Sequence, residues 1–136
     1  MQTDREKRIW LAAMFDAEGS IGITAQKQLK VGFGMKVNEP LIAFEHLFRP
    51  ASRTIDKKGF FRLFYYDNDA SELMSLIWEF LIEKQKIAKI TANCYPCARG
   101  KKRSSAEIAL ALQIRIFIQT LILPRIKFSE NVQLGI

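Results

Sequence analysis

The feature that most constrains the fold of this chain is a change of hydrophobic period at Gly19. Before it, Asp4–Asp16 is rich in residues of high helix propensity, and glycine is common at helix ends, so this segment predicts a helix. After it, Ser20–Thr24 alternates, with Ile21 and Ile23 on one face, which is typical of a strand with one buried side. The chain therefore begins with a helix that runs directly into a strand.

The same order of elements then follows a second time. Leu29–Val37 alternates again and predicts a hairpin with the first strand. Pro40–Phe48 begins with proline, which suits the first turn of a helix, and Pro50 ends it. Ser52–Lys57 and Phe60–Tyr66, joined by a turn, predict a second hairpin. Two helix-hairpin units indicate one antiparallel sheet.

The C-terminal part of the chain predicts further helices. Asp69 and Glu72 resemble a capping box and open a helix that we expect to continue to about Asn93. An appended helix is expected over about 104–123. The predicted fold is one α+β domain over residues 1–136, with an α-β-β-α-β-β-α core at about 4–95. Its antiparallel sheet of four strands carries helices on one face.

Composition favours an intracellular protein that binds a polyanion. The chain has 21 Lys and Arg against 14 Asp and Glu, a net charge of +7, and nucleic acid is the commonest polyanionic partner, although many small basic proteins bind none. Cys94, Cys97 and the single histidine, His46, cannot complete a zinc site within one chain, although two chains could share one. We interpret the cysteines as reduced thiols of the cytoplasm, nucleoid or organelle matrix. The charged N-terminal segment predicts no secretion signal, and no apolar run is long enough to span a membrane.

Leu11–Gly19 resembles the nine-residue motif that names the LAGLIDADG family of homing endonucleases. It matches the motif at Leu11, Ala12, Asp16, Ala17 and Gly19. It departs from it with Ala13 for glycine, Met14 and Phe15 for two other apolar residues, and Glu18 for the second aspartate. With the two helix-hairpin units that follow the motif, the resemblance covers roughly residues 8–95.

The resemblance implies a site-specific double-strand DNA endonuclease that uses Mg²⁺, with Mn²⁺ as a possible substitute. One motif per chain implies a homodimer on a long pseudo-palindromic target, because each chain holds half of the site. Glu18 and the backbone carbonyl of Ala17 from each chain are expected to hold the metal ions. Asp16 is expected to shape the helix end. The expected dimer interface is Ile9, Ala12, Ala13 and Asp16.

Physical chemistry agrees with a special role for this helix end. The helix dipole makes the C-terminal end a poor place for the carboxylates of Asp16 and Glu18. If two such helices meet on a two-fold axis, two Glu18 side chains converge and repel unless protons or cations lie between them. Oxygen ligands suit Mg²⁺ better than zinc. A helix end with two solvated acids is the alternative reading of the same residues.

Two lysines are the further catalytic candidates that the resemblance implies. The family places a basic residue near the scissile phosphate after the third helix, where Lys84 lies; an ordinary solvated lysine is the alternative. A polar residue late in the second strand joins the family's water network, and Lys36 matches best, with Asn38 next.

The polar face of the predicted sheet and the segment after the third helix form the expected DNA surface. Cations, amides and hydroxyls on a sheet can read a major groove, and glycines let the strands lie close to the bases. The stretch 84–103 has seven Lys or Arg and no acid, as a phosphate-contacting flank would. A solvated sheet face and a solubilising loop are the alternatives. The expected DNA-binding residues are Ser20, Gly22, Thr24, Gln26, Lys30, Gly32, Gly34, Lys36, Asn38, Arg53, Lys57, Arg62, Lys86, Lys101 and Lys102.

Two other classes of function remain open. A non-cleaving binder of the same fold could act as an intron RNA maturase, with its own intron RNA as partner, or as a DNA-binding regulator. A basic α+β module that binds protein or RNA by charge would make the motif a coincidence.

Overall fold

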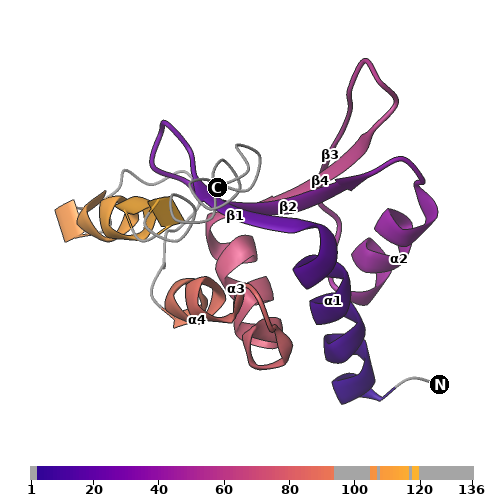
Figure 1. Ribbon diagram of the computed structural model, residues 1–136, viewed down its shortest axis with the longest axis horizontal. Coiled ribbons are helices and arrows are strands. Elements are labelled where there is room, and N and C mark those ends of the chain that lie inside the picture. Colours follow the sequence, from indigo (N-terminus) through magenta and orange to yellow (C-terminus); the bar gives the residue numbers. More distant parts are fainter. Residues whose placement is uncertain (1–2, 94–104, 107, 117, 120–136) are drawn as a thin grey trace, which may run out of the picture.

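The predicted α+β class is confirmed by a computed structural model that describes residues 3–93, 105–106, 108–116 and 118–119. The elements run in the order α1 (Asp4–Glu18), β1 (Gly19–Ile23), β2 (Leu29–Met35), α2 (Glu39–Leu47), β3 (Ser52–Ile55), β4 (Phe61–Tyr66), α3 (Asp67–Ile77), the 3₁₀ turn η1 (Trp78–Phe80) and α4 (Gln85–Asn93). The described strands form one antiparallel sheet in the order β1-β2-β4-β3. In Figure 1 the helices α1 to α4 lie together below this sheet.

The junction between α1 and β1 shows why the chain changes period where it does. Thr3 caps the start of α1, because its hydroxyl oxygen accepts the N–H of Glu6 at 3.1 Å. At the other end, the N–H of Gly19 donates to the carbonyl of Phe15. A Cβ on Gly19 would lie 2.4 Å from that carbonyl oxygen, so a residue without a side chain lets the helix pass directly into the strand.

The core fills the space between the sheet and the helices, as the alternation predicts. Leu29, Val31 and Phe33 of β2 point into it, and so do Leu63 and Tyr65 of β4. Buried residues of α1, α2 and α3 cover them. Burying each large apolar side chain contributes about 1.5–3 kcal/mol, so this layer fixes which face of the sheet remains free.

The predicted capping box at Asp69 and Glu72 is wrong. α3 begins two residues before Asp69, at Asp67, whose φ of +49° turns the chain out of β4 and whose Oδ1 accepts the N–H of Leu29 at 3.2 Å. Both predicted capping acids instead bind Arg49, Asp69 at 2.6 Å and Glu72 at 2.7 Å. Two carboxylates that the sequence pattern assigned to a helix end therefore hold the segment after α2 against α3.

The helix expected to continue to Asn93 is interrupted. α3 ends at Ile77, η1 follows, and a turn over residues 81–84 leads into α4. The backbone of this turn is held by the side chain of Asp16, which the periodicity of the segment cannot reveal.

Within the appended helix, residues 105–106, 108–116 and 118–119 are helical, and Ala111 and Ile114 are buried. The guanidinium of Arg115 donates to the carbonyl of Thr24 at 2.8 Å, so this helix is attached at the end of β1. The expected ends of this helix, Cys94, Cys97, Lys101 and Lys102 lie outside the described residues. Among the described helices, none is long and apolar enough to cross a membrane.

Candidate active site and nucleic-acid interface

The C-terminal end of α1 carries acidic side chains without a basic residue in its own last turn. Glu18 is the last residue of the helix, and its side chain is exposed, as is that of Ala17. Lys84 supplies the missing cation from the turn before α4, since its Nζ donates to the carbonyl oxygen of Asp16 at 2.6 Å. A positive charge at this end of a helix is favourable, because the main-chain dipoles leave it partly negative.

The carboxylate of Asp16 holds the turn that carries Lys84. It accepts the backbone N–H of Ile82 at 3.0 Å, of Glu83 at 3.1 Å and of Lys84 at 3.2 Å. Burial, the largest contribution, raises the pKa of Asp16, but these N–H groups and the Lys84 ammonium together lower it more, so the pKa lies below its ordinary value. Asp16 is therefore ionised at neutral pH and joins α1 to the start of α4.

The oxygen donors at this helix end are few. Glu18 offers one carboxylate and Ala17 one main-chain carbonyl, and both are the oxygen ligands that Mg²⁺ prefers. In the part of the chain that the structure describes, no three or more His, Cys, Asp or Glu side chains lie together so as to hold a metal ion. Within the described residues, Glu18 and Ala17 therefore do not by themselves make up a complete set of metal ligands.

The structure corrects one residue of the expected dimer interface. Ala12 is 0% exposed and belongs to the core of its own chain, so it cannot contact a partner. Ile9, which is 42% exposed, and Ala13 lie on the outer side of α1, as does Ala17. Asp16 is half-buried against the turn before α4. The small side chains available to a second helix are thus Ala13 and Ala17.

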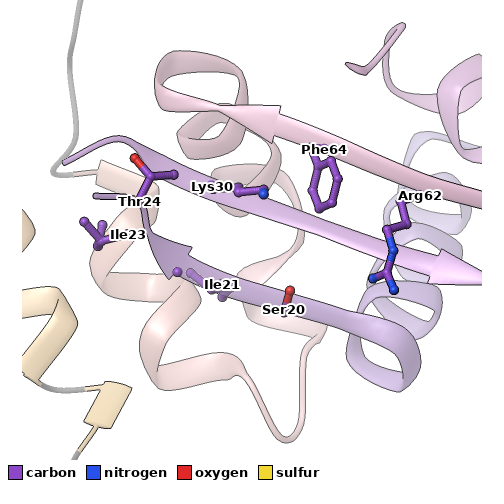
Figure 2. Close-up of a pocket in the computed structure, with 8 residues that line it drawn as sticks. Ser20, Ile21, Ile23, Thr24, Lys30, Arg62 and Phe64 are labelled. Atoms are coloured by element: carbon purple, nitrogen blue, oxygen red, sulfur yellow. The ribbon is translucent and has the colours of Figure 1, made fainter. Parts of the chain in front are cut away.

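The face of the sheet opposite the helices is free of covering elements within the described residues, and we call it the open face. The residues that face this side form cross-strand pairs. These pairs are Ser20–Gly32, Gly22–Lys30, Lys30–Tyr66, Gly32–Phe64, Gly34–Arg62 and Thr54–Arg62. A shallow cavity of about 520 Å³ lies on it, lined by Ser20, Ile21, Gly22, Ile23, Thr24, Lys30, Arg62 and Phe64. Figure 2 shows Lys30, Phe64 and Arg62 projecting from neighbouring strands β2 and β4 into this hollow.

The open face brings together most of the predicted DNA-binding residues of the first hairpin. Ser20, Gly22, Lys30, Gly32 and Gly34 lie on it. Thr24 and Lys36 continue the alternation just beyond β1 and β2, and Gln26 is exposed in the turn between those strands. Asn38 precedes α2, and Lys86 is exposed on α4, away from the strands.

The second hairpin differs from the expectation at Arg53. This residue pairs with core-facing Leu63, so its side chain lies on the helix side of the sheet, where it forms an ion pair with Glu45. Thr54 takes the open-face position instead. Lys57 is exposed in the turn between β3 and β4. Arg62 lies on the open face and is held by Asp56 at 3.3 Å.

Two aromatic residues of the open face, Phe64 and Tyr66, were not predicted as part of it. The signal was present, because both alternate in register with Arg62 in β4. Lys30 lies over them, with Nζ 4.0 Å from the Phe64 ring centroid and 5.9 Å from that of Tyr66. The position of the Phe64 ring also explains why residue 32 is glycine. A Cβ there would lie 2.1 Å from the Leu63 carbonyl oxygen and 2.6 Å from the Phe64 ring.

No protein-family model matches this sequence, and a search of curated proteins finds no match. Among solved structures, the chain is similar to the homing endonuclease I-CvuI in complex with the I-CreI target in the presence of 2 mM Mg, with the DNA not cleaved. That match has a TM-score of 0.60 at 15% identity, over 81% of this chain and 94% of the other. I-CvuI in complex with its own target, in the presence of 2 mM Ca, matches with a TM-score of 0.60 at 17% identity, over 87% and 96% of the two chains. The fold of this chain is thus homing-endonuclease-like.

Proposed function

We propose that this chain is a site-specific double-strand DNA endonuclease that hydrolyses phosphodiester bonds with a divalent metal ion, as a homodimer on a long pseudo-palindromic target. One observation carries the proposal. Glu18 places an exposed carboxylate at the end of α1, where the chain enters β1 and the open face begins. In a homing-endonuclease-like fold, this puts an acid next to a polar, cationic surface suited to DNA.

The homodimer is proposed because the described residues of one chain bring only Glu18 and Ala17 to this helix end. A second α1 approaching along Ile9, Ala13 and Ala17 meets small side chains that permit close packing, and it brings the partner's copy of the same carboxylate alongside Glu18. The four oxygen donors from two chains, a Glu18 carboxylate and an Ala17 carbonyl from each, fit Mg²⁺, with Mn²⁺ able to substitute. Such an ion, when bound, activates water and stabilises the leaving oxygen of a phosphodiester.

Lys84 is proposed as the basic residue of this site. Its ammonium donates a hydrogen bond to the carbonyl of Asp16, two residues before Glu18 in the chain. The positive charge of Lys84 therefore lies at the partly negative C-terminal end of α1. A cation fixed there stabilises negative charge that develops on a nearby phosphate. Lys36, which is exposed just beyond β2, is proposed as the polar residue that binds the water molecules around the reacting phosphate.

DNA binding is proposed for the open face. Ser20 and Lys30 offer a hydroxyl and an ammonium in the floor of the cavity, and the net charge of +7 attracts the DNA backbone. Arg62 is held in place by Asp56, so it can present its guanidinium to base edges with little loss of side-chain entropy.

The test is incubation of the full chain with a randomised double-stranded DNA library, in Mg²⁺ or in EDTA, followed by sequencing of cut ends. We expect cuts at one long, nearly palindromic sequence in Mg²⁺ alone, and sedimentation of the active species as a dimer. Tight binding without cutting in either condition would instead identify a non-cleaving binder, such as a maturase or a regulator. Cutting by a strict monomer would contradict the proposed homodimer.

A further inference from the structure

Phe64 is an aromatic side chain that the hydrophobic core does not use. Its neighbours Leu63 and Tyr65 are buried below the sheet, whereas Phe64 is only partly buried above it and, among the described residues, does not pack against the core cluster. The ring of Phe64 therefore stabilises the fold through no contact with the main core among the described residues.

The ring of Phe64 is held in one place from two sides. Beneath it, the backbone of Gly32 leaves room that a Cβ would fill, since that atom would lie 2.6 Å from Cδ1 of the ring. On one face of the ring, the ammonium of Lys30 lies over it, 4.0 Å from the centroid. Figure 2 shows the ring between Lys30 and Arg62 in the shallow cavity. A contact fixed before binding loses little conformational entropy when the ligand arrives.

The chemistry of the major groove limits what such a ring can contact. The base edges there offer hydrogen-bond donors and acceptors, and their one apolar group is the 5-methyl of thymine. A ring pressed against a donor or acceptor would strip water from it without replacing the hydrogen bond, which is unfavourable. The thymine methyl is the group that gains from the contact.

We propose that Phe64 is a specificity-determining residue that contacts the 5-methyl group of one thymine in each half-site. This inference rests on the proposed function, because it needs the open face to lie in a major groove. In a homodimer the two Phe64 rings read symmetry-related base pairs, so the preference for thymine appears twice in the target.

The test replaces thymine by deoxyuridine, which pairs identically and lacks only the methyl group. The target is selected by the full chain from random duplex DNA in EDTA, and each symmetric pair of thymines is then replaced in turn. At one pair we expect binding to weaken about fourfold per half-site, the effect of removing one methyl from an apolar contact. Phe64→Ala should bind the thymine and deoxyuridine targets equally at that pair.

Two further variants separate recognition from folding. Phe64→Leu keeps an apolar side chain over Gly32 and should retain part of the sensitivity to deoxyuridine. Tyr66→Leu removes an aromatic ring from the same face of the same strand and should leave the sensitivity at that pair unchanged. Retained sensitivity in Phe64→Ala, or its loss in Tyr66→Leu, would assign the contact to another residue.

Failure of this inference is distinct from failure of the proposed function. If the chain binds a specific target but no deoxyuridine substitution weakens binding, Phe64 does not read a methyl group, while the proposed function stands. If the chain selects no DNA sequence at all, both are overturned.

Discussion

Two hydrogen bonds join Asp16, near the end of α1, to Lys84, just before α4, and in each the side chain of one residue contacts the main chain of the other. The ammonium of Lys84 donates to the main-chain carbonyl of Asp16 at 2.6 Å, and the main-chain N–H of Lys84 donates to the Asp16 carboxylate at 3.2 Å. The end of the motif helix and the turn with the candidate catalytic lysine therefore form one unit.

Replacing Asp16 by Asn should destabilise the fold although the side chain keeps its shape. The carboxylate accepts three backbone N–H groups, and a neutral amide accepts them more weakly and cannot neutralise Lys84. We expect the free energy of unfolding to fall by about 1–2 kcal/mol in urea denaturation. Asp4→Asn is the matched control, because Asp4 is exposed and its ion pair with Arg8 contributes about 0.5 kcal/mol or less.

The contribution of Asp16 should also depend on pH. Burial opposes ionisation, but the backbone N–H groups and Lys84 outweigh it, so the pKa of Asp16 in the folded chain lies below its unfolded value of about 3.9. Its stabilisation is complete above the unfolded pKa and is lost as pH falls through the folded pKa. The difference in unfolding free energy between wild type and Asp16→Asn should therefore shrink as pH falls from about 5 to about 2. A difference that stays constant over this range would contradict the ionised contact.

Lys84→Met should lower both stability and cleavage. The loss of the hydrogen bond to the Asp16 carbonyl costs about 1 kcal/mol, and the acidic helix end loses its neutralising charge. Under the proposed function, we expect single-turnover cleavage to slow about a hundredfold with binding of the target little changed. Lys7→Met, an exposed position at the far end of α1, is the control. Normal cleavage by Lys84→Met would leave the lysine a purely structural role.

Two glycines of the open face should respond oppositely to alanine. At Gly32 a Cβ would lie 2.1 Å from the Leu63 carbonyl oxygen, so β2 and β4 must separate, and we expect a loss of about 1–3 kcal/mol. At Gly22 a Cβ has no atom within 4 Å, so Gly22→Ala should be neutral or slightly stabilising, since alanine restricts the unfolded chain. Thermal unfolding of both variants distinguishes them, and equal shifts would contradict the packing of Phe64 over Gly32.

The fold could be predicted from the sequence where local pattern and burial agree. The alternation of Leu29–Met35 set the facing of β2, and Gly19 marked the end of α1. Local pattern failed where distant residues decide. Asp69 and Glu72 have the spacing of a helix cap, but Arg49 binds both of them.

The candidate site shows the same division. The motif indicated Glu18, and the family resemblance indicated Lys84. The contact between Lys84 and Asp16 places the lysine at the end of α1. The facing of Arg53 and Thr54 could not be predicted, because three successive polar residues, Ser52–Thr54, give no alternation, and the register with β4 decides it. Gly32 was interpreted as making room for DNA, whereas its own neighbour Phe64 fills that room.

The most direct test of the central claim compares cutting and binding by Glu18→Gln on the selected target. The variant keeps the size of the side chain at the exposed end of α1 and removes its charge. The proposal predicts that it binds the target in EDTA as wild type does and cuts neither strand in Mg²⁺. Cutting of both strands by Glu18→Gln at the wild-type rate would show that the carboxylate at the end of the motif helix is not the metal-binding group.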